Sequence, residues 1–175
     1  MINDEDYSYA CFYAYELTQR YPEAPTGYFL LARARQLSGY YEPAIKAYND
    51  CIKVDKTYYP AYINLGLIKY EQKEYKQAIK QYNKVIKSKG YYKEKAIAYF
   101  NRAAVKHKLK NTNGALKDLE KVLIYDSNFP KTYNSYYYTR GLYKYSLGDI
   151  NGAKMDYKKT KEINSDCECE FYKNG

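Results

Sequence analysis

The strongest constraint on the fold of this 175-residue chain is a pattern of small and aromatic residues that recurs every 34 residues. In residues 59–92 the pattern falls into two halves, each with helical spacing, and the periodicity is interrupted between them near Lys73 and Glu74. The positions are Tyr62, Leu65 and Gly66 in the first half, and Ala78, Tyr82 and Val85 in the second. Each unit therefore predicts two short helices joined by a turn.

The same offsets occur along most of the chain. A leading helix is predicted at 4–20, and Tyr21 to Pro25 should end it. The four repeats span 25–58, 59–92, 96–129 and 134–167, and a tail covers 168–175. Because three residues precede the third repeat and four precede the fourth, about one helical turn each, the first helices of these repeats should begin a turn early. Pro130 would then lie in a first turn, where its missing N–H costs nothing.

The spacing resembles the tetratricopeptide repeat, whose unit has an aromatic residue, two further residues and then Leu-Gly, and later an alanine separated by three residues from another aromatic. The resemblance implies an all-α, right-handed α-solenoid of four helix pairs with a leading N-terminal helix, folded as a single domain over 1–175. The chain departs from the family at two positions. Basic residues replace an aromatic at Arg35, Lys69, Lys106 and Lys144, and the usual proline is replaced by Lys56, Gly90, Ser127 and Ser165.

Small residues should let the two helices of each pair approach closely. Ala32, Gly66, Ala103 and Gly141 are expected to face Ala44, Ala78, Ala115 and Ala153. At the N-terminus, Ala10, Ala14 and Leu17 have the offsets of a second helix, so the leading helix should cover the first repeat. In the last repeat, Lys154 and Lys161 replace residues that are apolar in the other repeats, which predicts a solvated face where the array ends.

Composition argues against catalysis and against a metal site. The chain has one histidine, His107, and no glycine-rich phosphate loop or recognisable carboxylate cluster, so we expect no enzyme and no cofactor. Cys167 and Cys169 are two neighbouring thiols, too few for a closed zinc site, and their role is open; Cys51 should be packing. No apolar run is long enough to span a membrane, and the start of the chain is acidic, which favours a cytoplasmic protein.

The resemblance implies a non-catalytic scaffold that binds a protein segment in the concave groove formed by the first helices. The candidate groove residues share one face of these helices or lie beside it. They are Phe29, Ile63, Asn64, Leu67, Tyr70, Phe100, Asn101, His107, Tyr138, Leu142 and Tyr145. These side chains could instead only pack helix on helix, or hold a second copy of the chain as a homo-oligomer.

The identity of the protein partner stays open, although one class is disfavoured. Some family members hold a chaperone C-terminal carboxylate with Lys, Asn and Arg on three successive first helices. Aligning that clamp on Asn64 puts Phe29 and Arg33 at its preceding Lys and Asn sites, and Ile97 and Asn101 at its following Lys and Arg sites. A chaperone tail is therefore not the expected ligand.

The formal charge of +9 gives an alternative function, a basic surface for nucleic acid or another polyanion. Lysines on the outward faces of second helices, such as Lys80, Lys84 and Lys87, would form it. A solvated helix face also needs polar residues, so specific nucleic-acid binding is the less favoured interpretation.

Overall fold

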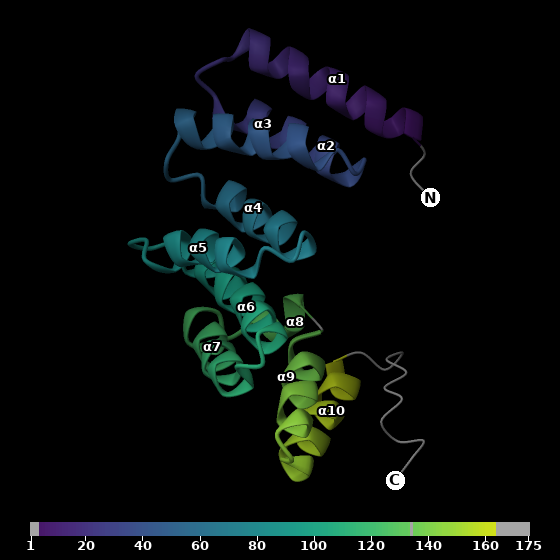
Figure 1. Ribbon diagram of the computed structural model, residues 1–175, viewed down its shortest axis with the longest axis vertical. Helices are drawn as coiled ribbons and strands as arrows, with labels where there is room; N and C mark the ends of the chain where they lie inside the picture. The colour runs from purple at the N-terminus through teal and green to yellow at the C-terminus, as the bar shows by residue number, and fades with distance from the viewer. Residues whose placement is uncertain (1–3, 134, 164–175) are drawn as a thin grey trace. The chain divides into compact units, whose positions relative to one another are not determined.

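The computed structural model describes residues 4–133 and 135–163, which form helices joined by turns, with no β-strand among them (Figure 1). The helices are α1 (Asp4–Arg20), α2 (Pro25–Leu37), α3 (Tyr41–Val54), α4 (Tyr59–Glu71), α5 (Tyr75–Ile86), α6 (Tyr92–Lys108), α7 (Thr112–Tyr125), α8 (Phe129–Thr132), α9 (Ser135–Ser146) and α10 (Ile150–Ile163). The predicted all-α class is confirmed.

The chain divides into two compact units, with the boundary between Ser88 and Lys89. In the first unit, α1 packs on α2, and α2–α3 and α4–α5 form antiparallel pairs. In the second unit, α6 pairs with α7 and α9 pairs with α10. Each unit has its own apolar core, built around Tyr48 in the first and around Phe129 and Tyr136 in the second.

The turn inside every pair has the same geometry. Gly39, Lys73, Lys110 and Gly148 stand at one position of the repeat and have φ of 79°, 61°, 61° and 84°. In the first pair, Gly39 N–H donates to the carbonyl of Gln36, and Tyr40 N–H donates to the carbonyl of Arg35. These are the two bonds of a Schellman motif, which satisfies the last carbonyls of a helix through one left-handed residue. Two repeats thus place a lysine where glycine is favoured.

Replacing Lys73 with glycine should therefore raise the free energy of unfolding by roughly 0.5 to 1 kcal/mol. Glycine removes the steric cost of a left-handed Cβ, and part of that gain is offset by its larger unfolded-state entropy. The control is Lys76→Gly, an exposed site inside α5, which should instead lower stability by about 1 kcal/mol. Urea unfolding of both variants measures the difference, and destabilisation by Lys73→Gly would contradict the turn assignment.

In the second repeat the two helices approach closely at Gly66, as predicted, but the atoms nearest to Gly66 belong to Tyr82. Gly66 is buried, and a Cβ added there would meet the ring of Tyr82, 2.7 Å from Cζ and 2.9 Å from Cδ1. The predicted neighbour was Ala78, one turn earlier on α5. In the fourth repeat, a Cβ on Gly141 would lie 3.1 Å from Tyr157 and 3.4 Å from the carbonyl oxygen of Ala153. The small residue thus makes room chiefly for an aromatic ring.

The leading helix α1 packs on α2 with a different face from the predicted one. Ala14 and Thr18 are buried, whereas Ala10 and Leu17 are exposed. A Cβ added to Gly27 on α2 would stand 3.2 Å from the backbone of Leu17 and Thr18. Because glycine lets the two backbones come this close, α1 turns its Ala14–Thr18 edge inward with Leu17 beside it, and the predicted register is wrong at Ala10.

The inserted residues behave differently in the two repeats of the second unit. Helix α6 begins at Tyr92, so the prediction of an early start holds there. Before α9, however, the insertion forms the separate helix α8, with Pro130 in its first turn, and the prediction of one continuous longer helix is wrong. Phe129 explains the break, because its buried ring stacks on Tyr133, with centroids 4.3 Å apart, and packs against Phe100.

Candidate functional site

In the first unit, the predicted groove residues of α2 and α4 are largely occupied by packing. Phe29 packs against the rings of Tyr48 and Tyr58, with centroids 5.8 and 5.1 Å apart. Ile63 is buried and Leu67 is half-buried. The Tyr70 ring lies 5.8 Å from that of Tyr75 at the start of α5. These contacts hold each first helix against its neighbours.

Asn64 has a partner that the sequence did not predict. Its amide nitrogen donates to Tyr48 Oη at 2.9 Å, and Tyr48 donates in turn to Gln36 Oε1 at 2.7 Å. Burial raises the pKa of Tyr48 to about 12, so its phenol keeps the proton that it donates. The chain of hydrogen bonds links α4, α3 and α2, and it fixes the orientation of the Asn64 amide within the first unit.

In the second unit, Phe100 and His107 contact the edge of α9 that faces the core. Phe100 packs on Tyr136, and the His107 ring stacks on Tyr143 with centroids 4.2 Å apart. His107 Nδ1 lies 3.1 Å from Thr112 Oγ1. Burial, followed by the charge of Lys108, lowers the pKa of His107, which favours the neutral imidazole. Both rings thus contribute to packing between α6 and α9.

Three of the remaining predicted residues of the second unit lie on another side of α9. Tyr138, Leu142 and Tyr145 are 36%, 39% and 47% exposed, and their spacing of four and three residues aligns them along the helix. Tyr138 also packs its ring against Tyr157 of α10, with centroids 5.7 Å apart. Asn101, on α6, is half-buried. Tyr138, Leu142 and Tyr145 are the most exposed of the predicted groove residues, and they form an apolar stripe along α9.

Two ion triads, each centred on a buried aspartate, were not predicted from the sequence. The guanidinium of Arg102 holds both carboxylate oxygens of Asp118, at 2.8 and 2.7 Å, and Lys106 Nζ lies 2.8 Å from the same carboxylate. Thirty-eight residues later, Arg140 holds both oxygens of Asp156, with Lys144 Nζ at 2.8 Å. Both aspartates are buried.

The triads explain why basic residues replace the family's aromatic at Lys106 and Lys144. In the first unit, the position of Arg102 and Arg140 is occupied by Leu31 and Leu65, and that of the aspartates by Ala47 and Gln81. The signal that could have revealed them is the simultaneous change of two positions sixteen residues apart, from Leu with Ala or Gln to Arg with Asp.

The described residues hold no group of three His, Cys, Asp or Glu side chains arranged to bind a metal. Cys51 is buried, as predicted, and burial raises the pKa of its thiol to about 12, which keeps it protonated and unreactive. Cys167, Cys169 and Ser165 lie outside the described residues, as does the tail at 168–175. Within the described part of the chain, no helix combines the length and the apolar character needed to cross a bilayer.

Comparison with known proteins identifies the repeat. A family model described as "Tetratricopeptide repeat" matches residues 25–58 and 59–92, the same bounds as the first two predicted repeats. Residues 25–92 therefore match two tetratricopeptide repeats. No curated protein sequence matches it.

Solved tetratricopeptide structures share the fold over most of the chain. "Crystal structure of MamA" is 21% identical, with a TM-score of 0.73, and the match covers 92% of this chain and 90% of that one. PilF of Pseudomonas aeruginosa is 19% identical, with a TM-score of 0.72 over 91% of this chain and 77% of that one. YrrB, described as a tetratricopeptide protein with an unusual peptide-binding site, is 16% identical, with a TM-score of 0.67 over 87% and 75%. At these identities the likeness establishes the fold alone.

Proposed function

We propose that this tetratricopeptide protein is a non-catalytic scaffold that binds a segment of another protein through the first-helix faces, with the exposed stripe of α9 as its main anchor. The tetratricopeptide fold is a protein-interaction scaffold, and YrrB supports peptide binding by such a fold. The observation that carries the proposal is the exposure of Tyr138, Leu142 and Tyr145 in one row.

The α9 stripe has the chemistry of a recognition surface. Two tyrosines and a leucine offer apolar area, while the tyrosine hydroxyls keep polar contact with solvent or with the ligand backbone. A ligand helix or extended segment that covered the row would bury the parts of these side chains that the folded unit leaves exposed. Asn101 would contribute a polar contact on α6 of the same unit, whereas Asn64 uses one amide N–H within the first unit.

The proposal also covers the identity of the partner and the cellular setting. The partner is a protein or peptide of unknown identity rather than a chaperone tail, because the clamp residues do not match. A second copy of the chain would use the same stripe and is distinguished by its effect on molecular mass. We also infer a cytoplasmic setting, in keeping with the free thiols of Cys11 and Cys51.

Leu142→Ala and Tyr145→Ala should each weaken binding of the partner segment by on the order of 1 kcal/mol or more, with almost no change in melting temperature. A photo-reactive residue at position 142 would first capture and identify the segment, with exposed Lys121 on α7 as the control position. Isothermal calorimetry with the identified segment then measures both variants.

The competing outcomes are separable. Unchanged affinity in both variants, with loss on reversing the charges of Lys80, Lys84 and Lys87, would refute the α9 site in favour of the basic surface. Crosslinks only between copies of the chain, together with a dimer mass in sedimentation, would assign the stripe to self-association.

A further inference from the structure

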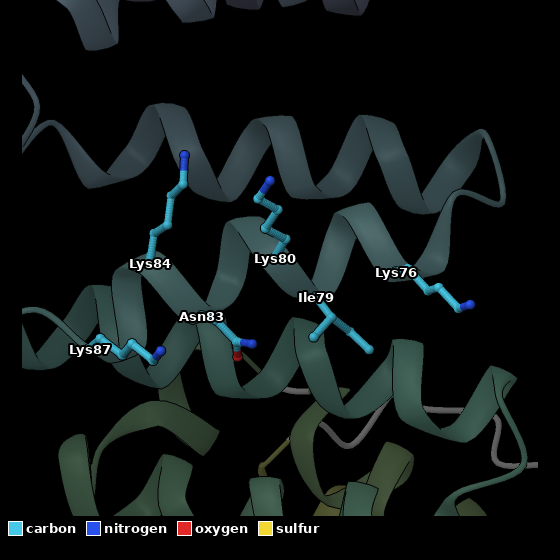
Figure 2. A pocket seen from close by; sticks show the side chains of 6 residues that line it. All are labelled: Lys76, Ile79, Lys80, Asn83, Lys84 and Lys87. Atoms are coloured by element: carbon cyan, nitrogen blue, oxygen red, sulfur yellow. The ribbon is translucent and has the colours of Figure 1, made fainter.

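Helices α3 and α5 carry hollows at equivalent positions of two consecutive repeats. The hollow on α3 is lined by Glu42, Ile45, Lys46, Asn49, Asp50, Ile52 and Lys53. The hollow on α5 is lined by Lys76, Ile79, Lys80, Asn83, Lys84 and Lys87, each of which stands 34 residues after a residue of the first set (Figure 2). The isoleucine and asparagine are shared, so the two hollows differ mainly in charge.

On α3 the charges cancel, whereas on α5 they all have one sign. Glu42, Lys46, Asp50 and Lys53 are two acids and two bases, and Lys53 Nζ lies 2.7 Å from Asp50 Oδ1. The corresponding α5 residues are four exposed lysines, and the helix Tyr75–Ile86 contains no acidic residue. Like charges one turn apart repel each other in the free protein, so an anionic ligand would relieve that repulsion.

The lysines stand in a row beside an apolar side chain. Figure 2 shows Lys76 and Lys87 near the two ends of α5, with Lys80 and Lys84 projecting to one side of the helix and Ile79 and Asn83 to the other. Lys84 Nζ also lies over the Tyr62 ring, 4.9 Å from its centroid. From position 76 to position 87 the row extends about 16 Å along the helix. A ligand would meet cations at intervals of about one turn, with the aliphatic side chain of Ile79 beside them.

We propose that the α5 hollow binds an acidic protein segment, with carboxylates about one helical turn apart and an aliphatic side chain seated on Ile79. This site is independent of the α9 stripe. A carboxylate-rich peptide uses both features of the hollow, because lysines pair with its acids and Ile79 contacts its apolar residue.

Nucleic acid fits the same hollow less well. Recognition of single strands depends on exposed aromatic rings on which bases stack. The two tyrosines of α5 are used elsewhere, because Tyr82 is fully buried and Tyr75 packs on Tyr70. The aliphatic side chain of Ile79 also offers nothing to a sugar–phosphate backbone, whereas it matches an acidic segment with interspersed apolar residues.

The chain supplies its own test variant. Lys76→Glu with Lys84→Asp gives α5 the charge pattern of α3, a pattern that the same fold already carries. The matched control is Lys154→Glu with Lys161→Asp, which changes the net charge equally at exposed positions of α10. Lys76→Gln with Lys84→Gln is a second test variant, in case the first perturbs folding as judged by circular dichroism.

Three fluorescent probes separate the alternatives by anisotropy at low and at physiological salt. The first is a helical peptide with four glutamates at the lysine spacing and one leucine opposite Ile79. The second replaces its glutamates with glutamine, and the third is a short oligothymidine. We expect the parent to bind the glutamate peptide at least about tenfold more tightly than the glutamine peptide, and both test variants to lose about tenfold, with the α10 control within about twofold of the parent.

Each contrary result overturns the proposal. Equal binding of the glutamate and glutamine peptides, or no binding of either, would show that the α5 charges recognise no acidic segment. Equal loss in the α10 control would reduce the effect to net charge. Tighter binding of oligothymidine than of the glutamate peptide, lost in the α5 variants, would assign the lysines to nucleic acid instead.

Discussion

Replacing Asp156 with alanine should lower the free energy of unfolding of the second unit by about 3 to 5 kcal/mol. Asp156 is 1% exposed and accepts hydrogen bonds from Arg140 through both carboxylate oxygens, with Lys144 as a third partner. Its removal would leave two largely buried cations facing each other without a counter-charge. The cost of an uncompensated buried charge is what makes this effect large.

Urea unfolding followed by circular dichroism measures the loss, and hydrogen exchange read by mass spectrometry localises it to residues 89–163. The matched control is Asp50→Ala, which removes an aspartate whose partner, Lys53, is 77% exposed. That change should cost less than about 1 kcal/mol, because surface ion pairs are screened by water and salt. Similar losses in both variants would contradict the role assigned to burial.

The same carboxylate predicts a pH dependence. Burial alone would raise the pKa of Asp156, but the hydrogen bonds and charges of Arg140 and Lys144 outweigh it, and the pKa falls below the ordinary value of 3.8. Because the folded state lowers this pKa, the triad contributes its full stability above about pH 4 and loses it as the pH falls through the folded-state value. The difference between parent and Asp156→Ala should therefore shrink below pH 4. A difference that stayed constant with pH would show that the charge is not responsible.

Gly66→Val should destabilise the first unit by about 1 to 3 kcal/mol, towards the upper end of that range. The first atom of the new side chain would already meet the Tyr82 ring, which is fully buried. Valine at exposed Gln77 of α5 is the control for its low helix propensity and should cost less than about 1 kcal/mol.

A double-mutant cycle identifies the clash. The third repeat has Ala103 and Leu119 where the second has Gly66 and Tyr82, so Tyr82→Leu should create space at this position. Gly66→Val with Tyr82→Leu is expected to be more stable than the sum of the single changes predicts. Additive losses would show that the valine is not excluded by the ring.

The repeat period predicted most of the helices because each pair is specified locally. Alanine, glycine and aromatic residues at fixed offsets are enough to place two helices and their turn. The contacts of the candidate site depend instead on distant residues. That Asn64 would donate to Tyr48, or that His107 would stack on Tyr143, follows only from the way successive pairs pack.

The errors have the same origin. The orientation of α1 is decided by Gly27 on the next helix, and the break before α9 is decided by the burial of Phe129 against Phe100. Neither contact can be recognised from the spacing of apolar residues within one helix. The exposure of Tyr138, Leu142 and Tyr145 depends likewise on which side of α9 its neighbours cover, so the spacing of these residues could place them on one face without showing that it is open to solvent.

The ion triads also affect which helices can pair during folding. If α9 aligned with α5 instead of α10, Arg140 would be buried opposite Gln81, with no carboxylate to meet it. If α4 aligned with α10, Asp156 would be buried opposite Leu65, without its arginine. Each exchange strands a charge in the interior, while the correct pairing neutralises it. In a chain whose helices otherwise look alike, the triads make it costly for a helix that carries one of their charges to pair with a helix of the first unit.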